Sequence, residues 1–239
     1  VLPDHMLLSR KFFSAVLMLS LSPILPTLHS AYVYSSPEEY THGVLAEYID
    51  SVYCSTCRAE LPTINSLYEE LRGGYIPVAY HALDEWVTNA SLQMMVKFTV
   101  VQTPYHVFDG GYVQGGGFIS KQWIDKAGAR PVHKIELAVK KTVSASNLTY
   151  YGSVRELDGQ PLEGLLRVFI VENKINAQNL EWNFVFRDFG IEQSVNISPN
   201  GYTRFSGSWK PRTEYKIENL MVIASVWKRD ATGRLLSIQ

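Results

Sequence analysis

The residues of this chain that could do chemistry are Cys54 and Cys57, the only two cysteines among its 239 residues. They lie three positions apart, where an apolar segment, residues 44–49, passes into a helix-like segment, residues 58–64. Two thiols at this spacing, at a corner between a strand and a helix, can open and close a disulfide reversibly. The pair therefore predicts a redox-active dithiol.

The position of each cysteine predicts its role. Cys54 is expected at a helix N-terminus, where free backbone N–H groups and the helix dipole favour a thiolate over a thiol. Such a placement typically lowers a cysteine pKa from about 8.5 into the range of roughly 3.5–7.5. Cys54 would attack a substrate disulfide, and Cys57, one turn further and more buried, would resolve the mixed disulfide. Ser55 and Thr56, between them, are expected to contact the substrate and to tune the redox potential.

Two other uses of the cysteine pair remain open. A Cys-x-x-Cys motif can supply half of a zinc site, but the sequence has no second pair of cysteines and no His-x-x-x-His motif. His81 and His106 are the only candidate histidines near the right ends of strands. A permanent structural disulfide is the other alternative, although so short a loop recovers little chain entropy. Redox use is favoured over both.

Two further features are assigned to the same site. Thr103 and Pro104 precede an apolar strand, and a cis Pro104 would place the backbone of Thr103 beside the cysteines, where it can position a substrate. Because only about 5–6% of X–Pro bonds are cis, a trans proline that opens the strand is the alternative. Glu47, on the strand that leads to Cys54, would accept a proton from Cys57 if it is buried, and would be a solvated strand residue otherwise.

Composition limits the partners. The chain has 22 Lys and Arg against 23 Asp and Glu, a formal net charge of −1. Without a basic excess to neutralise phosphates, nucleic acid is not expected as a partner. The dithiol needs no diffusible cofactor, so none is predicted.

The N-terminus predicts export. Arg10 and Lys11 precede an apolar run, residues 12–25, and small residues follow near Ser30. This pattern is typical of a secretory signal cleaved near Ser30, so residues 1–31 are assigned to a signal peptide, with an uncleaved N-terminal anchor as the alternative. The run is shorter than the roughly 20 residues of a membrane span. The protein is expected in the periplasm, at the cell surface or secreted, with membrane association only through this segment.

Residues 32–131 predict an α/β domain. The expected elements are a strand at 44–49, a helix from 54 to 71, a strand at 75–82, a helix at 90–98, strands at 105–108 and 112–114, and a helix at 120–129 with Ser120 as its cap. Asp109 and Gly110 between two apolar runs predict a hairpin. Pro77 favours an edge or strand-start position for its strand. Three layers around a mixed sheet would bury the strands on both faces.

Residues 132–239 predict a separate all-β sandwich of the immunoglobulin-like or jelly-roll type. Short strands are expected around 135–140, 148–157, 165–171, 182–186, 193–197, 202–209, 220–227 and 235–238, with no convincing helix. Trp182, Tyr202 and Trp209 are expected mainly between the sheets of this sandwich. If exposed, they would form a docking face for a protein or a glycan.

The segment Val-Leu-Ala-Glu-Tyr-Ile-Asp-Ser-Val-Tyr-Cys-Ser-Thr-Cys-Arg-Ala-Glu-Leu-Pro, residues 44–62, is similar to the active-site segment of the thioredoxin superfamily. Pro62, five residues after Cys57, matches the proline that kinks the family's active-site helix. Thr103 and Pro104, followed by Tyr-His-Val-Phe-Asp-Gly, match the family's cis-proline loop, so the resemblance implies a cis bond. Glu47 falls near the family's buried acid, with one more residue in the turn to the first cysteine. The resemblance covers roughly residues 41–129 and implies a thioredoxin-like domain.

The whole mature chain resembles, more loosely, exported proteins first described as outer-membrane proteins of Bacteroidetes-type bacteria. These proteins join a thioredoxin-like domain to a C-terminal β-sandwich. Residues 183–190 and 221–236 are similar to the signatures of that second domain. The chain departs from them because it lacks a cysteine after the signal that would take a lipid anchor.

These observations predict an exported thiol–disulfide oxidoreductase whose partner is a protein client or a redox protein. Cys54 is the predicted nucleophile, Cys57 the resolving thiol, Pro104 the positioning residue and Glu47 the proton acceptor. The alternative is a secreted or cell-surface binding protein. Its thioredoxin-like scaffold would be redox-silent, and its β-sandwich would serve as the interaction module.

Overall fold

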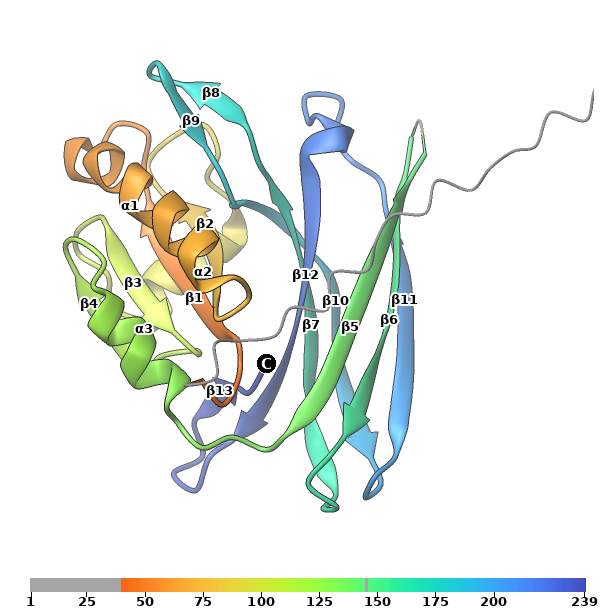
Figure 1. Ribbon diagram of the computed structural model, residues 1–239. Helices are drawn as coiled ribbons and strands as arrows, with labels where there is room; N and C mark the ends of the chain where they lie inside the picture. Colours follow the sequence, from red (N-terminus) through yellow and green to blue (C-terminus); the bar gives the residue numbers. More distant parts are fainter. Residues whose placement is uncertain (1–39, 145) are drawn as a thin grey trace, which may run out of the picture.

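Figure 1 shows a computed structural model of the protein, which describes residues 40–144 and 146–239. The signal peptide or anchor predicted for residues 1–31 lies outside these described residues. Within them, no helix is both long enough and apolar enough to cross a bilayer.

The first part of the chain follows the predicted order of elements. These are β1 (Val44–Asp50), α1 (Ser55–Leu71), β2 (Tyr75–His81), α2 (Asn89–Lys97), β3 (Tyr105–Phe108), β4 (Val113–Gly116) and α3 (Lys121–Gly128). β1 pairs in parallel with β2 and antiparallel with β3, and every residue of β1 is buried. β3 and β4 form the predicted hairpin, and Asp109 and Gly110 adopt positive φ in its turn. Ser120 stands at the start of α3, but its side chain makes no capping hydrogen bond.

The second part of the chain is built from strands and one short 3-10 helix. The elements are β5 (Ile135–Val143), β6 (Leu148–Glu156), β7 (Leu162–Glu172), β8 (Ile175–Ala177), β9 (Leu180–Trp182), β10 (Val185–Ile197), β11 (Tyr202–Trp209), η1 (Ile217–Asn219), β12 (Leu220–Arg229) and β13 (Leu235–Ser237). β5, β6 and β11 form a three-stranded antiparallel sheet, and β8 and β9 form a separate two-stranded hairpin.

The predicted fold class, an α/β thioredoxin-like domain followed by an all-β sandwich, is wrong. One eight-stranded mixed sheet runs through both parts of the chain, in the order β13-β12-β7-β10-β2-β1-β3-β4. Strands from either side of residue 131 are therefore neighbours in a single sheet, and only three α-helices occur in the described part of the chain. The protein is mainly β, and no separate sandwich follows an α/β unit.

The join between the two parts lies where β10 begins. Val185 of β10 is opposite Ala79 of β2 in parallel pairing, and the amide of Ala79 donates to the carbonyl of Phe184 at 2.8 Å. Pro77 lies two residues before Ala79, so its nitrogen faces the same side of β2. That nitrogen cannot donate a hydrogen bond, and the pairing with β10 does not extend to it. From Pro77 back to its first residue, β2 is therefore not paired with β10, although it lies between β10 and β1 in the sheet.

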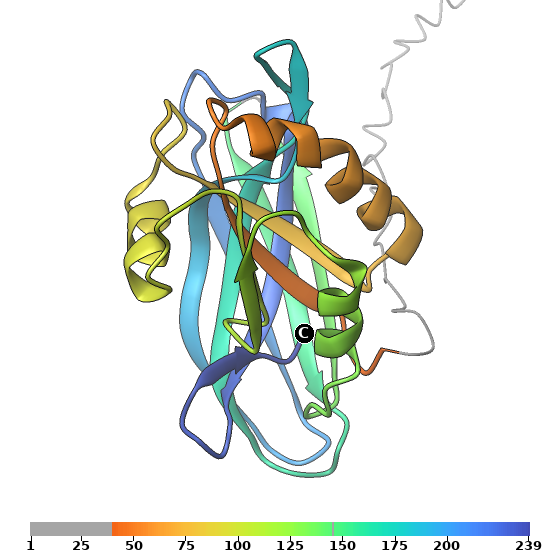
Figure 2. The same cartoon turned by 90° about the vertical axis from the view of Figure 1, so that its left-hand side faces the viewer.

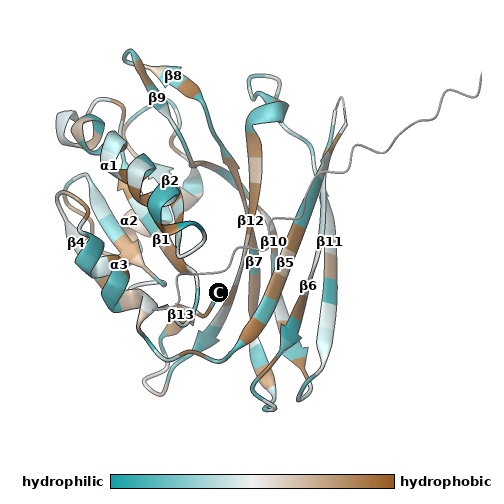
Figure 3. Cartoon of the chain, in the orientation of Figure 1, coloured by the Kyte–Doolittle hydropathy of each residue, from teal (hydrophilic) through white to brown (hydrophobic). Residues whose placement is uncertain are grey.

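The faces of the large sheet are covered by different layers (Figure 2). α1 and α3 pack on one face of β1, through residues that include Ile64 and Ile124, whereas Met94 of α2 packs on the opposite face. Along β7, Val168 faces the three-stranded sheet, and its neighbour Phe169 faces the α2 side. Apolar and polar residues alternate along β5, as Figure 3 shows, because one side of this strand faces the core and the other faces solvent.

A shared sheet predicts that the protein unfolds as one unit. Leu148 of β6 is fully buried, and Leu148→Ala is expected to cost about 2–5 kcal/mol. The loss should lower the Tm by about 5–15 °C for a chain of this size. Hydrogen exchange near the unfolding transition should then show peptides from β1 and β2 opening together with β6. Leu157→Ala, at a half-exposed position, is the control and should change the Tm little. If β1 and β2 kept wild-type protection while β6 opened, the single-unit description would be wrong.

Candidate active site

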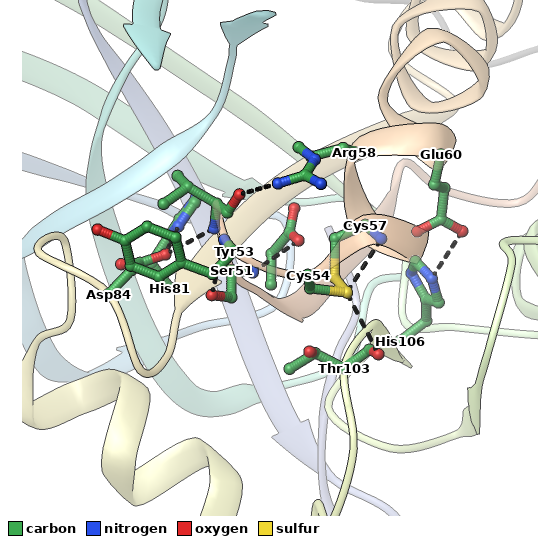
Figure 4. Close-up of a disulfide and its surroundings, with 12 residues drawn as sticks. Ser51, Tyr53, Cys54, Cys57, Arg58, Glu60, His81, Asp84, Thr103 and His106 are labelled. Carbon is green, nitrogen blue, oxygen red and sulfur yellow. Dashed lines mark hydrogen bonds and ion pairs between the residues drawn. A yellow bond between two sulfur atoms is a disulfide. The ribbon is translucent and has the colours of Figure 1, made fainter. Parts of the chain in front are cut away.

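The two cysteines form a disulfide at the N-terminus of α1 (Figure 4). Cys54 is the N-cap residue and Cys57 lies in the first turn, with their Cα atoms 5.2 Å apart, an ordinary separation for a disulfide. Cys57 is only 1% exposed, whereas Cys54 is half-buried. An attacking molecule can therefore reach Cys54 and not Cys57.

The start of α1 provides an electrostatic environment for a thiolate. The sulfur of Cys54 accepts the backbone N–H of Cys57 at 3.1 Å, as an N-cap side chain does. The first turn of α1 contains no acidic residue, and Arg58 in that turn donates to the carbonyl of Val52 at 3.1 Å. The helix dipole and this positive charge both stabilise an anion at Cys54 once the disulfide is reduced.

The loop before β3 lies against the first cysteine. The Thr103–Pro104 peptide bond is cis, the isomer that the family resemblance implied. The carbonyl oxygen of Thr103 lies 3.5 Å from the sulfur of Cys54. Ser55, beside Cys54, is exposed, and Thr56 is half-buried. The structure thus brings together Cys54, Cys57, Thr103 and Pro104, with Ser55 and Thr56 at the same helix terminus.

Glu47 does not join this group. Its side chain alternates with Ala46 and Tyr48, which pack against α1, so it lies on the opposite face of β1. There the hydroxyl of Tyr80 donates to its Oε1 at 3.1 Å. Burial raises the pKa of Glu47, although the charges of Lys97 and Arg167 on that face lower it in part. The structure therefore places the predicted proton acceptor across the sheet from α1.

Asp50 is the residue of β1 whose carboxyl lies on the face that α1 covers. It ends β1, shares the face of Tyr48 and is 1% exposed, and its Oδ1 accepts the backbone N–H of Ser51 at 2.8 Å. Burial raises its pKa to about 8, and the negative charges of Glu60 and Asp84 add to the rise. A buried carboxyl with this pKa can exchange a proton near neutral pH. Sequence reasoning missed Asp50, although its position four residues before Cys54 was visible.

Two buried histidine–carboxylate pairs flank the disulfide. His81 and Asp84 lie on one side, with Nδ1 and Oδ2 2.7 Å apart, and Glu60 and His106 lie on the other, with Oε1 and Nε2 3.1 Å apart (Figure 4). The sequence had offered the two histidines only as zinc ligands, and their carboxylate partners were missed. Within residues 40–144 and 146–239, no group of three or more His, Cys, Asp and Glu side chains could hold a metal ion.

The second part of the chain contributes to the site through the β8–β9 hairpin. Trp182 is 1% exposed and packs in one apolar cluster with Cys57 and Leu61 of α1. Its ring meets that of His81 edge-on, with centroids 5.3 Å apart. Trp182 is therefore core, as expected, but in the core of the cysteine site and not between the sheets of a sandwich. Tyr202, by contrast, is exposed on β11.

The sequence was also compared with known proteins. No protein-family model matches it, and no curated protein matches it.

The raised pKa of Asp50 makes a pH-dependent difference in stability testable. The unfolded chain ionises this carboxyl near pH 4, whereas the folded protein keeps its proton up to about pH 8. The folded state therefore loses stability at this residue as the pH rises between these values. In the oxidised protein, Asp50→Asn should be stabilising by a few kcal/mol at pH 8 and close to neutral at pH 4, as measured by denaturant unfolding.

Glu163→Gln, at an exposed position, controls for the general loss of one carboxylate and should show no such trend. A constant difference between Asp50→Asn and the wild type across this pH range would contradict a raised pKa at Asp50.

Proposed function

We propose that this protein is an exported thiol–disulfide oxidoreductase that acts on protein thiols and disulfides. The observation that carries the proposal is the unequal burial of two bonded cysteines at one helix N-terminus, where the half-buried Cys54 lies against the carbonyl of Thr103. Unequal access gives the two thiols different roles, because a client can reach the sulfur of Cys54, whereas Cys57 can attack only the sulfur of Cys54. The resemblance of residues 41–129 to the thioredoxin superfamily supports the same chemistry.

In the reducing direction, the Cys54 thiolate attacks one sulfur of a client disulfide. A new S–S bond forms between Cys54 and the client, and the second client sulfur leaves as a thiolate. Cys57 then gives its proton to the carboxylate of Asp50 and attacks the sulfur of Cys54. The mixed disulfide breaks, the first client sulfur leaves as a thiolate, and the Cys54–Cys57 disulfide forms. Two electrons pass to the client, and a reduced dithiol must restore them.

The client-facing surface is proposed to lie around Thr103 and Pro104. Tyr53, directly before Cys54, and Val101, two residues before Thr103, are 60% and 89% exposed. Exposed apolar side chains on both segments favour contact with a polypeptide over contact with a small polar thiol. Export is proposed from the N-terminal sequence pattern, which also agrees with the looser resemblance to exported proteins.

The catalytic role of Cys54 predicts a clear result in a turnover assay. The mature protein should accelerate the reduction of insulin by dithiothreitol, and Cys54→Ser should abolish this acceleration because no mixed disulfide can form. Cys57→Ser should also abolish turnover, but it should trap a covalent complex with a client thiol that mass spectrometry can detect. Thr63→Ser, at an exposed position further along α1, keeps both thiols and a hydroxyl, so it is the matched control and should remain active.

Equal turnover by the wild type and Cys54→Ser would contradict this proposal. Together with a failure of Cys57→Ser to trap any client, that result would favour the binding-protein alternative, in which the disulfide is structural.

The helix N-terminus predicts that Cys54 is the more reactive thiol after reduction. Its alkylation by iodoacetamide should follow a pKa well below the ordinary value of about 8.5, because dipole and backbone N–H groups stabilise the thiolate. Cys57 should be alkylated far more slowly, since it is buried. Peptide mapping after short exposure across a pH series measures both rates. Alkylation of the two cysteines at similar rates would argue against the assigned roles.

A further inference from the structure

Asp84, in the loop after β2, holds three parts of the site together. Its Oδ2 accepts the backbone N–H of Val52, in the turn that carries Cys54, at 2.9 Å. Its Oδ1 accepts the backbone N–H of Trp86 at 2.9 Å, and Nδ1 of His81 lies 2.7 Å from Oδ2. The side chains of Asp84 and His81 have no exposed surface. Buried carboxylates persist only where such partners are supplied, so this one is built into the site.

We propose that the buried His81–Asp84 pair is a positioning unit of the dithiol, which fixes the turn before Cys54 and tunes proton transfer at Asp50. The inference rests on the proposed function, because it assigns roles within that reaction. Neither member of the pair is required to touch the client. Asp84 acts through the amide of Val52 and through its charge, and His81 acts by holding Asp84.

The pair carries one negative charge at neutral pH. Burial raises the pKa of Asp84, but the hydrogen bonds from His81, Val52 and Trp86 outweigh burial and bring that pKa below its ordinary value. Burial lowers the pKa of His81, and the charge of Arg187 adds to this, so the pKa lies below its ordinary value although Asp84 and Glu85 raise it. A neutral imidazole can still donate its Nδ1–H to the carboxylate, which assigns the tautomer. Asp84 therefore stays ionised inside the protein, where His81, Val52 and Trp86 surround its two carboxylate oxygens.

This charge acts on Asp50. Asp50 and His81 are direct neighbours in the parallel pairing of β1 with β2, so their side chains leave the same face of the sheet. The negative charges of Asp84 and Glu60 add to the burial that raises the pKa of Asp50 to about 8. A group with a pKa near the working pH can both take the proton of Cys57 and return it. Removing the charge of Asp84 should therefore lower the pKa of Asp50.

Two other charged groups act on the pair, Glu85 in the same loop and Arg187 on β10. The other charged groups on the neighbouring elements are Glu60 and Arg58 on α1 and His106 on β3. Arg187 is held by Glu172 at 2.8 Å, and Glu85 is exposed. Among the carboxylates, Glu60 and Asp84 are the two that raise the pKa of Asp50. Glu85 is therefore a matched control, because it is a carboxylate one residue after Asp84 whose charge is screened by solvent.

The test is the titration of Asp50 in the oxidised full chain, followed by the 13C shift of its carboxyl carbon and assigned with Asp50→Asn. Asp84→Asn keeps an acceptor for Val52 and His81 but removes the charge. We expect it to lower the Asp50 midpoint by about one pH unit, the size of shift that a single charge produces in a partly screened interior. The rate at which dithiothreitol reduces the disulfide in a single turnover should fall as Asp50 loses its proton. In Asp84→Asn, this fall should occur at a correspondingly lower pH. Glu85→Gln should leave both midpoints at their wild-type values.

Two substitutions of His81 test how the charge is held. His81→Leu removes the donor, so Asp84 should take up a proton and the Asp50 midpoint should fall as in Asp84→Asn, with no further fall in the double variant. His81→Asn offers an amide donor near the position of Nδ1 and should restore the wild-type midpoint.

If Asp84→Asn lowered stability but left the Asp50 midpoint and the pH dependence of reduction unchanged, the pair would be merely structural and the inference would be wrong. The proposed function would survive that result, provided that insulin reduction still depended on Cys54. A wild-type disulfide that dithiothreitol does not open at any pH would overturn both.

Discussion

The structure depends on the fact that β2 pairs with a strand on each of its two sides. One side of β2 pairs with β1 and the other meets β10, so the large sheet continues from the first part of the chain into the second. A single short parallel pairing, with Val185 opposite Ala79, makes neighbours of strands that are about a hundred residues apart in sequence. Because the next strands, β7 and β12, add to β10, the core on both faces of the sheet is shared.

The same join determines what surrounds the disulfide. β10 begins just after the β8–β9 hairpin, and this order places Trp182 against Cys57 and His81. The buried cysteine is thus enclosed by side chains from both parts of the chain. Cys54, at the helix terminus, is only half-buried and lies against the Thr103 loop. The second part of the chain therefore lines the site, and the difference in burial between the two thiols depends on this packing.

The site also concentrates buried carboxyl groups in a way that stability alone would not favour. Asp50, Glu60 and Asp84 all lie within the protein, and only the last two have a histidine partner. Burying an unpaired carboxyl costs free energy unless it keeps its proton, which is why the pKa of Asp50 is raised. Perturbed groups of this kind gather at functional sites more often than elsewhere. In the proposed reaction, the helix terminus stabilises the thiolate and Asp50 accepts the proton.

The sequence by itself determined what is local. The start of a helix at Cys54, the order of elements from β1 to α3 and the hairpin at Asp109 all follow from spacing and turn chemistry over a few residues. It did not determine the fold class, because a strand's pattern shows which of its faces are apolar but not which strand will pair with its edge. The edge of β2 was filled by β10, and two expected strands, at 182–186 and 193–197, became mostly one long strand.

For the site, residue type and spacing predict the two cysteines and the Thr103–Pro104 loop, and the structure places them together. Sequence reasoning named Glu47 as the proton acceptor and did not consider Asp50. Because β1 is buried on both faces, its apolar pattern does not show which face α1 covers. Only the packing of α1 on the face of Tyr48 and Asp50 settles which carboxyl lies on the cysteine side. The sequence predicts the chemistry of the dithiol, and the pairing of strands in the large sheet determines which side chains surround it.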